Sequence, residues 1–144
     1  MSCFTVIKKA ETEVAKVSFC SDNIVRVMIK RNVDVTPEQF KELFALYNQL
    51  AEGEAFPYLY YAEDSSSNIT EEGRRYAKEN EFSFPKVCNA ALVTRLAHKL
   101  LADFYLKFNK PHYPFKVFSN MDDAEKWCLE QYAKYQKSHL VSCK

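Results

Sequence analysis

The side chains best suited to chemistry stand together in one polar stretch. Asp64 precedes three consecutive serines, Ser65, Ser66 and Ser67, and Thr70 follows them. A carboxylate beside a hydroxyl suggests a base and a nucleophile, but an activated serine needs a positioned general base, and the sequence places no histidine there. A polar loop that ends a strand and caps the next helix explains the same residues and is the favoured interpretation.

The same stretch is also a candidate recognition or phosphorylation site. A phosphate on one of the serines would lie beside the start of the next helix, where added negative charge is tolerated. Glu63 and Asp64 would repel that phosphate. The functional hypothesis for this stretch is a partner-binding or phosphorylation loop that includes Thr70.

The sequence contains no pattern typical of a metal or cofactor site. The histidines His98, His112 and His139 lack the spacing of zinc ligands, and none stands near a cysteine in the pattern that zinc requires. Five irregularly spaced cysteines, at positions 3, 20, 88, 128 and 143, predict the reduced thiols of a cytoplasmic protein. We therefore expect no metal, no cofactor, no catalytic residue and no enzymatic activity.

A second hypothesis is a pocket for a small apolar or anionic ligand. Tyr60 and Tyr61 lie in an aromatic segment, and Leu100 and Phe104 lie in a later helix expected to cover it. Basic residues around that helix, beginning with Arg95, could attract an anion. A solvated helix face explains these basic residues too and is favoured. The other members of the set are Lys99, Lys107, Lys110, His112 and Lys116.

Aromatic residues are numerous enough to suggest a surface patch as well as a core. The chain has 11 Phe and 9 Tyr, and an apolar patch left on the surface marks a partner site. The segment around Phe104 and Phe108 is rich in aromatic residues. A twofold dimer through helix surfaces near it is the simplest expectation.

Length and charge narrow the class of protein. A chain of 144 residues, 47% hydrophobic, is large enough for one domain with its own core, and we expect a single domain over 1–144 with its core at about 11–136. Twenty basic residues nearly balance nineteen acidic ones, which disfavours a dedicated nucleic-acid binder. The absence of a long apolar run and of a signal-peptide core predicts no membrane span and a cytoplasmic protein.

Alternating hydrophobic residues predict strands. Residues 12–20 and 24–30 each alternate around a short polar turn, which predicts a β-hairpin. Further strands are predicted over 56–62, 87–93 and 115–118. The segment 87–93 is apolar at both parities, as in a parallel strand that is covered on both faces.

Helices are predicted between these strands. Thr36 and Pro37 mark the start of the first, and Asn68 is expected to cap the second. A third is predicted over 94–110, and a fourth begins at Ser119 or Asn120 and frays from residue 138. The order ββαβαβαβα implies an α/β domain: a mixed, mostly parallel five-stranded sheet with four helices.

Several segments along this order carry a family resemblance. They are Glu13–Val17, Val25–Val33, Ile69–Ala77, Ala90–Val93 and Asn109–Phe118, with Ala124 and Trp127 in the last helix. Together they resemble bacterial proteins related to the STAS domain, the fold of the anti-anti-sigma factors of sporulation, over roughly residues 11–130. The resemblance implies a STAS-like fold.

The resemblance also implies a type of function. It suggests a non-enzymatic regulatory or protein-interaction module that binds a protein partner through residues 63–70 and the helix over 68–80. The anti-anti-sigma proteins carry a regulatory serine in an Asp-Ser-Ser-Gly motif. Here Asp64-Ser65-Ser66 is followed by Ser67, so the phosphorylation switch does not carry over. The alternative function is a carrier or sensor of the small ligand described above.

Overall fold

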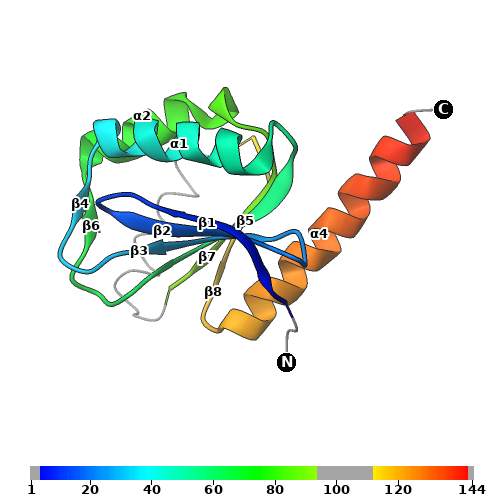
Figure 1. The fold of residues 1–144 in the computed structure, drawn as a ribbon, viewed down its shortest axis with the longest axis horizontal. Helices are drawn as coiled ribbons and strands as arrows, with labels where there is room; N and C mark the ends of the chain where they lie inside the picture. Colours follow the sequence, from blue (N-terminus) through cyan, green and yellow to red (C-terminus); the bar gives the residue numbers. More distant parts are fainter. Residues whose placement is uncertain (1–3, 94–111, 143–144) are drawn as a thin grey trace.

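Six strands form one sheet with helices on both of its faces (Figure 1). The structure is a computed structural model that describes residues 4–93 and 112–142. In spatial order the strands are Val6–Glu11 (β1), Ala15–Cys20 (β2), Val25–Ile29 (β3), Phe56–Ala62 (β5), Lys86–Leu92 (β7) and Phe115–Phe118 (β8). The neighbours β1, β2 and β3 are antiparallel, whereas β3, β5, β7 and β8 are parallel. The expected mixed, mostly parallel sheet of an α/β protein is confirmed.

The predicted hairpin is present as β2 and β3, but the sheet has one strand more than predicted. Asn23 in the hairpin turn has a left-handed backbone (φ 67°), a conformation that asparagine tolerates. The prediction of five strands is wrong because β1 adds an edge strand. Its Val6 and Ile7 are 50% and 56% exposed, so β1 lacks the one-sided apolar pattern by which a strand is recognised in a sequence.

The first helix, Pro37–Ala51 (α1), begins where the sequence predicts. The Thr36 hydroxyl accepts a hydrogen bond from the backbone N–H of Gln39 at 3.4 Å, and proline occupies the first turn. At the other end, Glu52 and Gly53 both have positive φ, 53° and 76°, which is a common way for a helix to stop. Local sequence therefore sets both ends of α1.

The second helix, Glu71–Glu79 (α2), begins later than predicted. The Thr70 hydroxyl caps it by accepting a hydrogen bond from the Gly73 N–H at 2.9 Å. The predicted Asn68 cap is wrong because Asn68–Ile69 (β6) forms a small parallel ladder with Asp34–Val35 (β4).

Two apolar clusters fix the helices to the sheet. α1 and α2 cover one face, and the last helix, Met121–Ser142 (α4), covers the other (Figure 1). Large buried side chains of the first cluster include Val17, Val27, Leu43, Phe44, Tyr47, Tyr58 and Phe84. The second cluster contains Ile24, Leu59, Val87, Cys88, Ala90, Ala124 and Cys128.

The helix α4 is longer than predicted. Asn120 caps it, since its side-chain oxygen accepts a hydrogen bond from the Asp123 N–H at 2.8 Å. The prediction of a frayed tail from residue 138 is wrong, because the helix continues to Ser142 and extends beyond the sheet (Figure 1).

The described residues contain three α-helices rather than the four predicted, together with the short 3-10 turn Glu81–Ser83 (η1). The predicted third helix, 94–110, lies outside the described residues. Among the helices that the structure describes, none combines the length and the apolar character needed to cross a bilayer.

Candidate functional site

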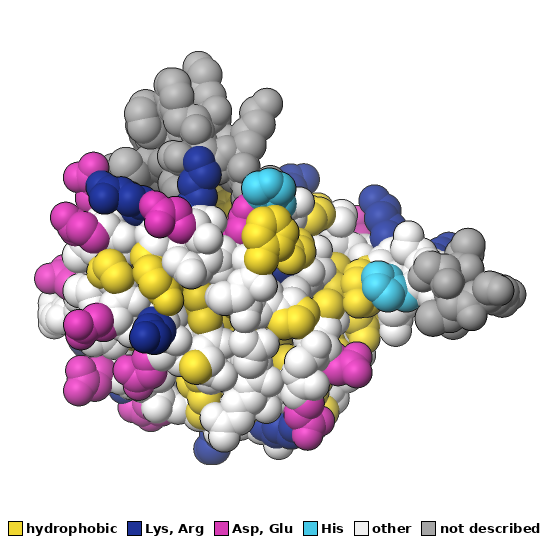
Figure 2. Space-filling model, turned by 90° about the horizontal axis from the view of Figure 1, so that it is seen from above, with side chains coloured by type: hydrophobic (Ala, Val, Ile, Leu, Met, Phe, Trp, Pro, Cys, Tyr) yellow, Lys and Arg dark blue, Asp and Glu magenta, His cyan; other side chains and the backbone are white. Residues whose placement is uncertain are grey.

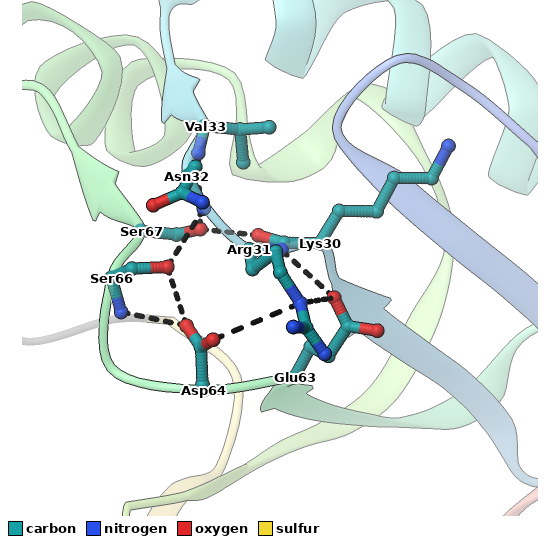
Figure 3. A network of polar contacts seen from close by, with 8 residues as sticks. All are labelled: Lys30, Arg31, Asn32, Val33, Glu63, Asp64, Ser66 and Ser67. Carbon is teal, nitrogen blue, oxygen red and sulfur yellow. Dashed lines mark hydrogen bonds and ion pairs between the residues drawn. The ribbon is translucent and has the colours of Figure 1, made fainter.

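Two loops leave the sheet side by side at the carboxyl ends of β3 and β5. We call residues 30–33 and 63–67 the loop pair (Figure 3). β3 and β5 are parallel neighbours, and Ile29 lies opposite Ala62 at their last pairing. The Glu63 N–H donates to the Ile29 carbonyl at 2.8 Å, so the two loops begin in contact. In α/β sheets, the carboxyl ends of parallel strands are the usual place for a functional site.

Two serine hydroxyls join the loops. The Ser66 hydroxyl accepts a hydrogen bond from the Asn32 backbone N–H at 2.8 Å and donates to Asp64 (Figure 3). The Ser67 hydroxyl accepts from the Val33 N–H at 3.2 Å and donates to the Lys30 carbonyl. Each hydroxyl therefore satisfies backbone groups of the opposite loop, which have no ladder partner where the strands have ended.

An ion pair reinforces the same contact. The Arg31 Nε donates to a Glu63 carboxylate oxygen at 2.9 Å and lies 3.8 Å from Asp64 (Figure 3). Its hydrogen bond lowers the pKa of Glu63, and Glu63 in turn raises the pKa of Arg31. The Arg31 side chain is 61% exposed, so solvent screens this pair and its energetic contribution is small. The main effect of the ion pair is to neutralise the carboxylates of Glu63 and Asp64 and to hold the two loops in this geometry.

The contacts continue past the loop pair into the start of α2. The Asn68 N–H donates to the Val33 carbonyl at 3.0 Å, and the Thr70 N–H donates to the Val35 carbonyl at 3.1 Å. Thr70, a predicted site residue, therefore continues the β4–β6 pairing with its backbone N–H and caps α2 with its hydroxyl. Residues 30–35 and 63–73 form one continuous hydrogen-bonded unit.

The exposed side chains on this unit are the candidate recognition surface. Residues 63–66, Asn68 and Ile69 are exposed, and Ile69 is an apolar side chain with 38% of its area accessible. Ser65 takes no part in the hydrogen bonds that hold Ser66 and Ser67. The structure thus separates the predicted serines into two that stabilise the loop and one, Ser65, that is presented to solvent.

The predicted ligand-pocket residues do not share one side of the sheet. Tyr60 packs with the cluster beneath α1, whereas Tyr61 packs with the cluster beneath α4. Successive residues of a strand point to opposite faces, so one pocket between the sheet and a helix cannot be lined by both rings. Burial raises the pKa of both hydroxyls. The remaining predicted residues of this set, Arg95, Leu100, Phe104 and Phe108, lie outside the described residues.

Two buried polar atoms on neighbouring strands, beneath α1 and α2, were not anticipated from the sequence. The Tyr58 hydroxyl and the Asn89 side-chain oxygen have no hydrogen-bond partner within the described part of the chain. Tyr58 on β5 pairs in register with Asn89 on β7, so both side chains point to the same face. The sequence does indicate a buried polar group at Asn89, because this residue is the polar one inside an apolar strand.

Lys86 at the start of β7 is a second unanticipated feature. The residue is 5% exposed, and its Nζ lies 3.9 Å from the centroid of the Phe84 ring and 4.4 Å from that of Tyr113. The same amine donates to the Glu81 carbonyl. Burial lowers the pKa of Lys86 to about 8. A lysine at the start of a strand gives no sequence signal of burial, because lysines are almost always exposed.

Arg26 forms a third polar cluster, beneath α4. Its guanidinium donates two hydrogen bonds to the Asp22 carboxylate, at 3.0 and 2.8 Å, and one to Glu125 at 2.5 Å. The centroid of the Phe4 ring lies 3.6 Å from the guanidinium carbon. These carboxylates raise the pKa of Arg26 even though burial lowers it. The buried charge is fully compensated, which fits a structural role.

A shallow surface hollow of about 400 Å³ lies between β8 and α4. Its walls include Lys116, Phe118, Lys126 and Trp127. Across the described residues, no group of three or more His, Cys, Asp or Glu side chains is arranged to hold a metal ion.

Comparison with known proteins identifies one family. A family model described as "Domain of unknown function (DUF7793)" matches residues 18–133. No curated protein and no solved structure matches the chain. The matched range includes the loop pair and the first part of α4, and it ends just after Tyr132.

Proposed function

We propose a function for the chain, which belongs to the DUF7793 family, a domain of unknown function. It acts as a non-enzymatic regulatory module of STAS-like fold and binds a protein partner through the loop pair and the start of α2. The observation that supports this best is the network of Ser66, Ser67 and Arg31, which holds two loops in one conformation. Preorganised loops bind at a smaller entropic cost than mobile ones.

The chemistry of the surface also suits a protein partner. It presents hydrogen-bonding groups and partly neutralised carboxylates around one exposed apolar side chain, Ile69. Such a mixed surface is typical of interfaces between separately folded proteins. Phosphorylation of Ser65 would add charge at the exposed position without removing the bonds of Ser66 and Ser67, and it would change the affinity for the partner.

A site-specific cross-linking experiment tests the proposal. A photoreactive amino acid is placed at Ser65 in the native cell and, as a control, at Glu42, which is exposed on α1. We expect a defined protein adduct from position 65 that is missing from position 42. Equal adducts at both positions, or none at position 65, would contradict a partner site on the loop pair.

A second variant links the adduct to the loop geometry. Ser67→Ala removes the bonds to Lys30 and Val33 and should lower the yield of the position-65 adduct several-fold. Ser83→Ala makes the same chemical change at an exposed serine of η1 and should leave the yield unchanged. A yield that is unaffected by Ser67→Ala would show that the network does not prepare the surface.

One observation favours a carrier or sensor of a small ligand as the second candidate. The Tyr58 hydroxyl and Asn89 oxygen are buried on one face without a partner among the described residues. An unpaired buried polar group costs about 1–3 kcal/mol, which a small molecule with a donor group would recover. Native mass spectrometry of the purified protein should then detect a bound molecule that Tyr58→Phe releases. A spectrum of bare protein alone contradicts this function.

A further inference from the structure

Lys86 is a buried cation without a matching carboxylate. The residue is 5% exposed, and none of the ion pairs formed among the described residues includes its amine. Arg26 is buried to a similar degree, at 6% exposed, but it is paired with both Asp22 and Glu125. Burying an unpaired charge is expensive, so the structural role that fits Arg26 does not fit Lys86.

The surroundings of this amine favour its neutral form. The Lys86 Nζ donates to the Glu81 carbonyl, and the centroids of the Phe84 and Tyr113 rings lie 3.9 and 4.4 Å away. One carbonyl and two ring faces are poor substitutes for water around an ammonium group, which has three donors. Burial accordingly lowers the pKa of Lys86 to about 8, although Glu81 acts in the opposite direction. A lysine that is desolvated in this way is an activated nucleophile.

Three further titratable side chains surround the amine of Lys86. The Glu81 carboxylate accepts hydrogen bonds from the His112 ring and from the His112 backbone N–H, the second at 3.3 Å. Burial raises the pKa of Tyr113, and the Glu81 carboxylate raises it further, so this phenol keeps its proton in the neutral pH range. The carboxylate of Glu81 is thus engaged by His112 instead of by Lys86.

Side chains at the surface cover the amine on one side. Tyr113 is partly exposed, and its ring lies 5.5 Å from that of Phe82, which is 63% exposed. The Phe82 ring in turn lies 4.9 Å from the exposed ring of His112. Figure 2 shows hydrophobic side chains gathered beside a histidine on this side of the molecule. Because side chains at a surface change rotamer within nanoseconds, a rotation of Tyr113 gives a small molecule access to Lys86.

We propose that Lys86 captures a small aldehyde with an apolar substituent as a reversible imine, independently of the loop pair. The lone pair of the neutral amine attacks the carbonyl carbon and forms the C–N bond, and the carbonyl oxygen takes up the two amine protons and leaves as water. A protonated imine keeps a cation against the rings of Phe84 and Tyr113 and one N–H for the Glu81 carbonyl. The rings also offer an apolar surface to the substituent and exclude the water that would hydrolyse the imine.

Reductive trapping with benzaldehyde tests the capture site. The full chain is incubated with benzaldehyde and sodium cyanoborohydride at about pH 7.5, and peptide mapping by mass spectrometry follows the benzyl group on each lysine. Lys86 should be labelled at least about tenfold faster than Lys41, an exposed lysine of α1, because burial makes a larger fraction of its amine neutral. In urea that unfolds the chain, the two rates should become equal. Equal rates in the folded chain, or no label on Lys86, overturns the proposal.

The same measurement in two variants tests whether the enclosing rings activate the amine. Tyr113→Ser removes one ring and admits water, so the preference for Lys86 over Lys41 should fall several-fold. Tyr113→Phe retains the ring and should retain the preference. In the natural chain, the labelling rate of Lys86 should also level off above about pH 8, the pKa of its amine. An equal loss in both variants, with circular dichroism showing both folded, or a rate that still rises at about pH 10, contradicts the proposed site.

Discussion

At the scale of single residues, Lys86 shows how the fold changes the chemistry of a side chain. Its amine is enclosed by the rings of Phe84 and Tyr113 and by the Glu81 carbonyl. Burial lowers the pKa of Lys86 from 10.5 to about 8. Between these two values the unfolded chain holds more protons than the folded one, so the free energy of unfolding should rise with pH.

Comparison with Lys86→Met isolates this effect. Between pH 7.5 and 9.5, the free energy of unfolding of the natural chain should rise by roughly 1–2 kcal/mol relative to that of the variant. Urea denaturation at several pH values provides the measurement. The window ends below pH 10, where tyrosines of the unfolded chain begin to ionise. Parallel curves for the two proteins would show that Lys86 keeps an ordinary pKa.

Gly73 is the residue at which an added methyl group should be most harmful to the unit around the loop pair. A Cβ there would lie 2.5 Å from the Val35 carbonyl oxygen and 3.2 Å from the Phe40 ring. Gly73→Ala should therefore push α2 away from β4 and lower the free energy of unfolding by about 1–3 kcal/mol in chemical denaturation. Arg75→Ala, at an exposed position of the same helix, should change it by less than about 0.5 kcal/mol.

At the scale of elements, the cap of α2 joins a helix to a strand ladder. The Thr70 hydroxyl accepts from the Gly73 N–H at 2.9 Å and lies 3.3 Å from the Val35 carbonyl. Thr70→Ala should lower the free energy of unfolding by about 1 kcal/mol, measured by urea denaturation. Thr70→Ser retains the hydroxyl and should cost much less. Equal losses in both variants would assign the effect to the methyl group rather than to the cap.

The elements also show which structural signals are local. Thr36 and Pro37 predict the start of α1 because a cap depends on adjacent residues. Asn68 has the right side chain for a cap, but the distant Val33 and Val35 draw its segment into a ladder. β1 escapes prediction because neither of its faces is consistently buried.

The candidate site, too, can be predicted from the sequence only in its local features. Its position after β5 and its polar character can be predicted from Asp64 and the serines. Their bonding to residues 30–33 cannot, because those partners are more than thirty residues away in the sequence. The burial of Lys86 and Arg26 likewise depends on tertiary packing that the strand pattern does not encode.

At the scale of the whole molecule, the projecting part of α4 should contribute little to the stability of the domain. Tyr132 contacts Phe56 of the sheet, and Tyr135 still packs against the cluster beneath α4. A chain that ends at Gln136 should keep its free energy of unfolding within about 1 kcal/mol, measured by urea denaturation. A larger loss, or a cooperative transition that disappears, would show that residues 137–144 belong to the core.

The buried Arg26 cluster has a consequence for the order of folding. Asp22 is four residues away, within the hairpin, whereas Glu125 is 99 residues away on α4. The nearby carboxylate can neutralise the arginine as soon as the hairpin forms, and the distant one acts only after the last helix docks. In stopped-flow experiments, Glu125→Gln should therefore speed unfolding while leaving the folding rate nearly unchanged, whereas Asp22→Asn should slow folding.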